Sequence, residues 1–263
     1  MTAPAEGRQA PWSEIEKETK DLLRLATESG LTLRTVGSTG IRLHCFDAAA
    51  AMDRSGRPPK DIDVVGLSGE RTKLRKLLEG RGYELDRDVL VAMEGARYCC
   101  THTTSGIELD VFFDRLEFCH TIELVSRMKE PAATIPVEDL LLQKLQVHEL
   151  TDSDSVDAAI VLAVHEVAGS SGGGEVIDAS YVAKVLANDW GFHRTATENL
   201  DKIEQRAEPV LLGEAASRTI RERIGELRVA IDAAPKSLSW RLRSRVGERV
   251  QWWNDVSERE LTY

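Results

Sequence analysis

The spacing of hydrophobic residues divides this chain into a mixed first half and a helical second half. Before Pro136, segments in which apolar and polar residues alternate, as in strands, are separated by amphipathic segments with a helical period. This order predicts an α+β fold, with a mixed β-sheet and flanking helices. Strands are expected at 31–36, 61–67, 97–102 and 107–113, and helices at 13–30, 39–46 and 70–80.

Local signals predict the ends of several of these elements. Ser13 and Glu16 form a capping-box pattern before the first helix, and Gly30 is placed to end it. Residues 103–106, Thr-Thr-Ser-Gly, predict a hairpin between the last two strands. Residues 47–60 contain alanine repeats, a glycine and two prolines, and we expect an exposed loop there.

Beyond Pro136, apolar residues recur at helical spacing almost to the end of the chain. The strongest interruption is the glycine- and serine-rich segment 169–174, which predicts a flexible linker. We therefore expect a sheet domain over residues 1–130 and a helical domain over 131–263, with the linker inside the latter. The expected helices of this half are 138–149, 157–167, 181–186, 197–206, 214–233 and 238–254.

Composition and charge narrow the class of protein. Among 263 residues, 30% are charged and 42% are hydrophobic, which is typical of a soluble globular protein. No apolar run approaches the roughly 18 residues of a membrane span, and the first nine residues lack a signal-peptide core. With only four scattered cysteines, we expect a reduced, cytoplasmic protein that makes no membrane contact.

The net charge of −10 argues against non-specific binding of nucleic acid by the whole surface. Residues 214–250, however, carry nine Lys or Arg against five Asp or Glu, and Trp240, Trp252 and Trp253 lie in or near this stretch. Two interpretations remain open for it: a surface that contacts nucleic acid, or an amphipathic helix whose tryptophans pack internally. The cysteine and histidine spacings fit no familiar zinc pattern.

The most informative chemistry is a set of carboxylates on predicted strands. Asp61 and Asp63 are two residues apart, so both side chains point to one face of their strand while Ile62 faces the core. Asp110 and Glu108 are placed in the same way on a later strand, and parity alone does not choose between them. Clustered carboxylates repel one another unless a cation joins them, and such oxygen ligands suit Mg²⁺.

A small-residue turn precedes these acids. Gly37 would let backbone approach a phosphate, Ser38 offers a hydroxyl, and the helix expected after them supplies free N–H groups. The turn by itself is a weak signal, because such turns are common. The specific feature is the order of the motifs along the chain: Gly-Ser, then Asp-x-Asp, then a third acid on a later strand.

This order resembles the DNA polymerase β-type nucleotidyltransferase superfamily. Residues 37–43, Gly-Ser-Thr-Gly-Ile-Arg-Leu, are similar to a segment of the AbiEii-like group of bacterial toxin nucleotidyltransferases. Residues 60–64 resemble that group's Ser-x-Asp-Ile-Asp-Leu segment, with Lys60 in place of a small residue, and 138–145 resemble its Glu-Asp-Leu-Leu-x-x-Lys-Leu helix. The resemblance covers about residues 31–160.

The resemblance implies roles for individual residues. Asp61, Asp63 and Asp110 would be the catalytic, metal-binding acids, with Asp110 preferred over Glu108 because it directly precedes Val-Phe. Asp110 would also help to deprotonate the attacking hydroxyl. The nucleotide-binding residues implied by the remaining motif positions are Gly37, Ser38, Thr39, Lys144 and Asp154. Lys144 would neutralise the charge of the triphosphate, and Asp154 would either join the site or only cap a helix.

The implied activity is transfer of a nucleoside monophosphate from an NTP to an acceptor hydroxyl, with Mg²⁺ or Mn²⁺ and release of pyrophosphate. The same group implies RNA, such as tRNA, as the acceptor and a cognate antitoxin as a partner. Two alternatives stay open. One is the same chemistry on a small cationic acceptor such as an aminoglycoside, which the acidic composition favours. The other is a nucleotide-binding module without catalysis, although all three acids are present.

Overall fold

The computed structural model describes residues 10–45, 59–169, 176–206 and 209–256. The loop expected at 47–60 and the linker expected at 169–174 lie outside the described residues, apart from their end positions. No helix in the described ranges is long and apolar enough to cross a membrane.

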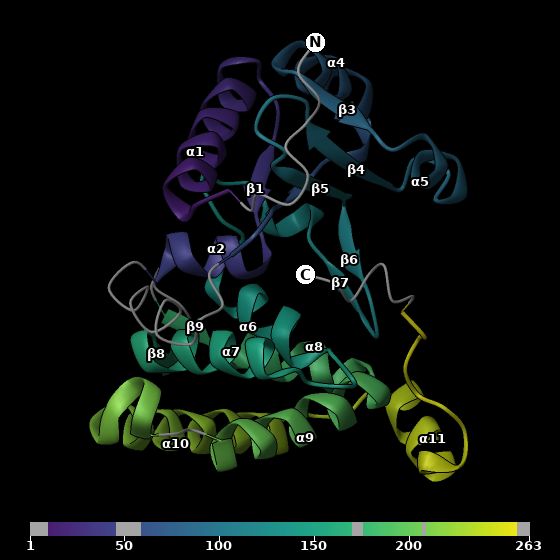
Figure 1. The fold of residues 1–263 in the computed structure, drawn as a ribbon. Coiled ribbons are helices and arrows are strands. Elements are labelled where there is room, and N and C mark those ends of the chain that lie inside the picture. The colour runs from purple at the N-terminus through teal and green to yellow at the C-terminus, as the bar shows by residue number, and fades with distance from the viewer. Residues whose placement is uncertain (1–9, 46–58, 170–175, 207–208, 257–263) are drawn as a thin grey trace.

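A five-stranded mixed sheet forms the layer drawn at the top of Figure 1. The strand order is β1-β2-β5-β4-β3, with β2 and β5 parallel and every other neighbouring pair antiparallel. The strands are β1 (Leu33–Thr35), β2 (Ile62–Gly66), β3 (Tyr83–Leu85), β4 (Arg97–His102) and β5 (Glu108–Phe113). The α+β prediction is therefore confirmed, as is the hairpin that joins β4 to β5.

The two faces of the sheet are covered differently. On one face, Ile62 and Val64 are fully buried in a core shared with α1 (Trp12–Glu28) and α4 (Arg71–Arg81). The other face turns toward α2 (Gly37–His44) and the helical layer, and Val65 belongs to the core there. Asp61 and Asp63 share the parity of Val65, so alternation along β2 directs both acids toward the helices.

Helices of the second half form the lower layers in Figure 1. Their core also includes Val65 and Phe112 of the sheet, so one continuous apolar cluster joins the two halves. The proposed division at residue 130 stays a prediction. The helices are α6 (Val137–Leu145), α7 (Asp152–Val164), α8 (Ala179–Asn188), α9 (Trp190–Arg206), α10 (Pro209–Ala233) and α11 (Leu238–Val246).

Short elements escaped the sequence analysis. Strands of three residues and a helix of six give too little periodicity to identify. They are β3, α5 (Arg87–Ala92), β6 (Arg115–Glu117), β7 (Thr121–Glu123), β8 (Glu166–Ala168) and β9 (Val176–Asp178), with three-residue 3₁₀ turns at Ser68–Glu70, Val125–Arg127 and Gly247–Arg249.

Several helices begin or end at other residues than the sequence signals predicted. The predicted capping box is wrong, because Pro11 is the N-cap of α1 and no side chain caps this helix. Helix α7 begins five residues earlier than predicted, since the Thr151 hydroxyl accepts a hydrogen bond from the Asp154 amide. Helix α9 likewise begins at Trp190, where Asp189 accepts from the amide of Phe192 at 3.1 Å. Helix α11 ends at Val246, eight residues before the predicted end.

Candidate active site

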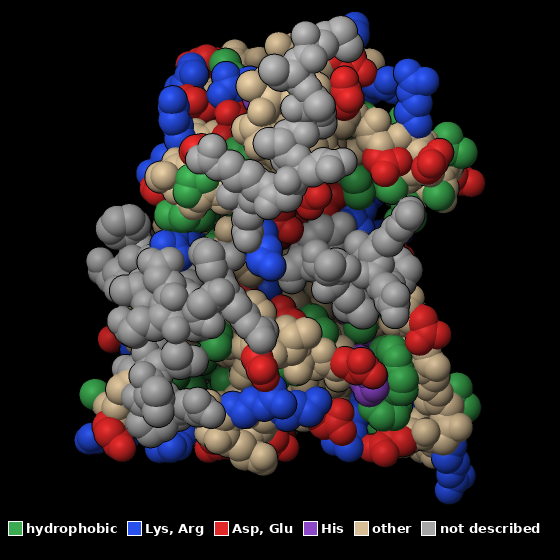
Figure 2. Space-filling view, in the orientation of Figure 1, with side chains coloured by type: hydrophobic (Ala, Val, Ile, Leu, Met, Phe, Trp, Pro, Cys, Tyr) green, Lys and Arg blue, Asp and Glu red, His purple; other side chains and the backbone are tan. Residues whose placement is uncertain are grey.

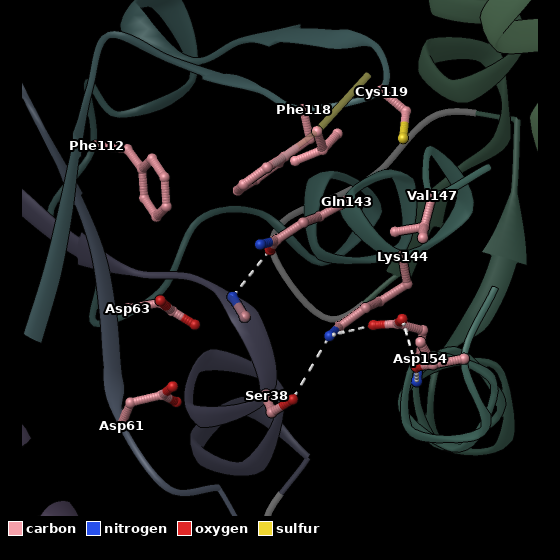
Figure 3. A pocket seen from close by; sticks show the side chains of 13 residues that line it. Ser38, Asp61, Asp63, Phe112, Phe118, Cys119, Gln143, Lys144, Val147 and Asp154 are labelled. Carbon is pink, nitrogen blue, oxygen red and sulfur yellow. Dashed lines mark hydrogen bonds and ion pairs between the residues drawn. The ribbon is translucent and has the colours of Figure 1, made fainter. Parts of the chain in front are cut away.

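A cleft lies between the sheet and the helical layer (Figure 3). In the space-filling view, acidic and basic side chains both appear at this level of the molecule (Figure 2). Strand β2, the start of α2, and helices α6 and α7 supply the polar walls. The lining residues are Gly37, Ser38, Asp61, Asp63, Phe112, Phe118, Cys119, Gln143, Lys144, Val147, Thr151, Asp154 and Val256.

Six of the eight predicted site residues, Gly37 among them, line this cleft on two walls. Asp61 and Asp63 project from the β2 side, and Ser38 begins the neighbouring helix (Figure 3). Lys144 and Asp154 come from α6 and α7 on the other wall. The remaining two, Thr39 and Asp110, lie outside the lining.

Gly37 allows the turn before α2 to lie in close contact with Asp63 of β2. Its φ of +65° belongs to the left-handed region, and a Cβ atom here would lie 2.2 Å from Asp63 Oδ2. Its amide donates to Gln143 Oε1 at 2.9 Å, which ties the turn to α6. Thr39 also ties this turn to the strand, because its hydroxyl donates to the Asp61 carbonyl at 2.7 Å. The backbone of the turn is thus locked against both acids.

The acids on β2 are buried and under strong mutual repulsion. Asp63 is 6% exposed, and its Oδ1 atom has no hydrogen-bond partner among the described residues. Burial first, and then the charges of Asp61 and Asp110, hold the pKa of Asp63 well above its usual range. Burial, Asp110 and Glu108 raise the pKa of Asp61 from 3.8 to about 6. An unpartnered buried oxygen among like charges fits a cation.

The third acid is in a different environment. Asp110 is opposite Asp63 in the parallel β2–β5 register, but its Oδ2 atom accepts from Arg97 Nη2 at 2.9 Å. Both side chains of this ion pair are less than a tenth exposed. No group of three or more His, Cys, Asp or Glu side chains within the described ranges is arranged to hold a metal ion. Of the three predicted strand acids, Asp61 and Asp63 line the cleft and Asp110 does not.

Lys144 is fixed on the opposite wall by two carboxylates. Its Nζ atom lies 3.0 Å from Asp154 Oδ1 and 2.9 Å from Asp157 Oδ2. Burial alone would lower the pKa of Lys144, but the two acids outweigh burial and raise it, so the amine stays protonated. Ser38 joins this network, because its hydroxyl donates to Asp157 Oδ2 at 2.5 Å and lies 3.5 Å from Lys144 Nζ.

Asp154 combines the two roles that the sequence left open. Its amide is capped by the Thr151 hydroxyl at 3.1 Å, while its carboxylate faces the cleft and pairs with Lys144. Burial raises the pKa of Asp154, but Lys144 and Thr151 outweigh burial, so the net effect is a lowered pKa. The neighbouring Asp152 is exposed and pairs with Arg206 at 3.3 Å instead.

Several residues of the site were missed by sequence reasoning. Gln143 and Asp157 belong to the motifs that were read, but each was treated only as part of a helix or its cap. Phe112 and Phe118 form an apolar wall of the cleft, with ring centroids 5.3 Å apart and an edge-to-face angle of 69°. No sequence signal separates these two phenylalanines from ordinary core residues.

The C-terminal tryptophans make internal contacts. Trp253 stacks on His148 with centroids 3.5 Å apart, and Trp252 Nε1 donates to the Thr195 hydroxyl at 3.1 Å. The Asn254 amide then donates to the Cys119 carbonyl at the edge of the cleft. These contacts favour internal packing over nucleic-acid binding for this tail.

No protein-family model matches this chain, and neither does any curated protein. Among solved structures, the chain is similar to the lincomycin-bound lincosamide antibiotic adenylyltransferase LnuA, with 18% identity and a TM-score of 0.39 over 56% of this chain and 95% of that one. It is similar to the antibiotic-resistance factor ANT(2'')-Ia, with 14% identity and a TM-score of 0.38 over 66% and 95%. It is also similar to an antigenic nucleotidyltransferase-like protein from Paracoccidioides brasiliensis, with 14% identity and a TM-score of 0.41 over 86% and 96%. At these TM-scores, the likenesses assign neither a family nor an activity to this chain.

Proposed function

We propose that this protein is a metal-dependent nucleotidyltransferase that moves a nucleoside monophosphate from an NTP to an acceptor hydroxyl, releasing pyrophosphate. The observation that carries the proposal is the buried Asp63 carboxylate beside the Gly37 turn, whose Oδ1 atom has no hydrogen-bond partner among the described residues. Across the same cleft stands the protonated amine of Lys144. A cation site and an ammonium group facing one cavity suit a triphosphate.

Asp61 and Asp63 would hold Mg²⁺ or Mn²⁺, since their oxygens are the hard ligands that these ions prefer. The bound ion would neutralise the negative charge that builds up on the phosphates during transfer. Burial and mutual repulsion raise the pKa values of both acids when no ion is bound, so two neighbouring negative charges are unfavourable there.

The other polar residues in and behind the cleft would bind and orient the triphosphate. The Ser38 hydroxyl and Lys144 would bind the leaving pyrophosphate end, because both face the cleft near the start of α2. Asp154 and Asp157 keep Lys144 protonated and fix its position. The attacking hydroxyl would give up its proton to solvent as its oxygen bonds to the α-phosphorus and the bond to pyrophosphate breaks.

For the acceptor, we propose RNA, with tRNA as the first candidate, and activity as a toxin held in check by a cognate antitoxin. What supports this choice is the resemblance of residues 31–160 to the AbiEii-like group. A small cationic acceptor remains the competing proposal, and the acidic composition of the chain favours it.

The test is transfer of label from each NTP, radiolabelled at the α-phosphate, into total RNA with Mg²⁺ or Mn²⁺. We expect RNase-sensitive label that is lost in Asp63→Asn and kept in Asp152→Asn, a matched change at an exposed acid. Label that survives RNase and requires a small polyol would identify the competing acceptor. NTP binding with no transfer to RNA or to small polyols, at either metal, would contradict the enzymatic proposal.

A further inference from the structure

Within the described residues, one of the three strand acids of the proposed site makes an ion pair, and that acid is Asp110. Arg97 on β4 donates to Asp110 Oδ2 at 2.9 Å, and both residues are 5% exposed. By contrast, Oδ1 of Asp63 has no partner within the described residues. Arg97 is therefore paired with the Asp110 end of the acid cluster, whereas the charges of Lys144 and Arg97 do not offset the raised pKa of Asp63.

The strand register explains why Arg97 can reach this acid. In the antiparallel β4–β5 pair, Cys99 is opposite Asp110 and Arg97 is opposite Phe112, so these four side chains lie on one face of the sheet. Arg97 meets Asp110 on the diagonal of this pairing, a distance that long side chains span. Its guanidinium also lies over the Phe112 ring, 4.9 Å from the centroid.

Cys99 lies directly opposite Asp110 in the β4–β5 register. Burial first, and then Asp110, raise the pKa of the Cys99 thiol, so this neighbour stays uncharged. Asp61 and Asp63 line the cleft, whereas Asp110 does not. A divalent ion at Asp110 would have to compete with a permanently charged guanidinium that is held both by the carboxylate and by an aromatic ring.

We propose that Arg97 is a positioning residue that replaces a second divalent cation, so that the cleft takes a single metal ion on Asp61 and Asp63. Asp110 then acts as an arginine-bound carboxylate and not as a metal ligand. This inference rests on the proposed function, because it concerns the same acids. It changes the ion count from the two expected in a two-metal transfer site to one.

The experiment counts bound Mn²⁺ with the metal alone, from the loss of the free-ion signal in electron paramagnetic resonance. We expect the wild-type protein to bind one Mn²⁺ per chain. Arg97→Gln removes the charge at Asp110 and should raise the count to two, whereas Arg97→Lys should restore it to one. Arg71→Gln is the matched control, because Arg71 also lies over a phenylalanine ring, 4.7 Å from the Phe113 centroid, and should leave the count at one.

Two Mn²⁺ ions on the wild-type chain, or one on a folded Arg97→Gln protein, would overturn the inference. If Arg97→Gln does not fold, Asp110→Asn decides the matter: it should still bind one Mn²⁺ per chain, and loss of the bound ion would identify Asp110 as a ligand. Failure of the proposed function looks different. In that case Asp63→Asn binds Mn²⁺ as the wild type does, and no nucleotide is transferred.

Discussion

Replacing one of the proposed metal ligands should stabilise the metal-free protein. The change is Asp61→Asn, which removes a buried charge and keeps the shape and hydrogen-bonding oxygen of the side chain. The pKa of Asp61 rises from 3.8 to about 6, first because of burial and then because of Asp110 and Glu108. At about 1.4 kcal/mol per pKa unit, the ionised carboxylate costs the fold about 3 kcal/mol at pH 7.5.

The sign of the pH dependence follows from the direction of this shift. Between pH 3.8 and about 6, the folded state binds more protons at Asp61 than the unfolded state does, so stability falls as the pH rises through this window. Asp61→Asn removes this loss. Its advantage should be about 3 kcal/mol at pH 7.5 and only about 1 kcal/mol at pH 4.5.

Urea unfolding in the presence of a chelator measures this difference at the two pH values. Asp152→Asn, at an acid whose side chain is 74% exposed, should change stability by no more than about 0.5 kcal/mol at either pH. Adding Mg²⁺ should stabilise the wild-type protein and leave Asp61→Asn almost unaffected. A variant that is less stable than the wild type at pH 7.5, or equally altered at both pH values, would refute the reasoning about buried repulsion.

Two further substitutions probe the walls of the cleft. Gly37→Ala forces an L side chain into a left-handed conformation and against Asp63. It should lower the free energy of unfolding in urea by about 1–3 kcal/mol and abolish Mn²⁺ binding. The control Gly225→Ala, where an added Cβ meets no atom within 4 Å, should be neutral or stabilising. Lys144→Met leaves the buried Asp157 carboxylate without its cation, so it should cost about 3–5 kcal/mol at pH 7.5, and most of that loss should return in the double variant with Asp157→Asn.

The alternation of β2 was the part of the site that sequence could predict well. Side-chain parity placed Asp61 and Asp63 on one face, and the structure shows Ile62 and Val64 fully buried on the other. Parity needs no knowledge of neighbouring strands, so it survives errors in the ends of elements. The same parity put Asp110 and Glu108 on one face of their own strand, but only the structure shows that Asp110 is opposite Asp63 in the parallel β2–β5 pair.

The Lys144 network shows what sequence could not supply. A helix expected to begin at residue 157 leaves Asp154 in a loop and makes Asp157 a cap. Because Thr151 starts the helix earlier, the two acids are three residues apart on one helical face and both reach Lys144. An error of five residues in the predicted start of α7 was therefore enough to conceal that Asp157 pairs with Lys144.

The Arg97–Asp110 pair was hidden for a different reason. Whether Arg97 meets Asp110 or points past it depends on the register of the β4–β5 hairpin, and a shift by one residue would send the arginine to the opposite face. The hairpin itself was predicted, but the exact turn pairing was not. Cross-strand diagonal contacts of this kind therefore require the structure.

The charges that line the cleft also imply an order of binding. Among the described lining residues, Asp61, Asp63 and Asp154 are acidic and Lys144 is the one cation, and Lys144 is shared between Asp154 and Asp157. A bare triphosphate would meet a net negative surface, and its binding would add to the repulsion that already raises the pKa of both β2 acids. An ion between those acids and the phosphates removes both penalties at once. Metal and nucleotide should therefore bind together, each strengthening the other, because neither charge is balanced in this cleft without its counterpart.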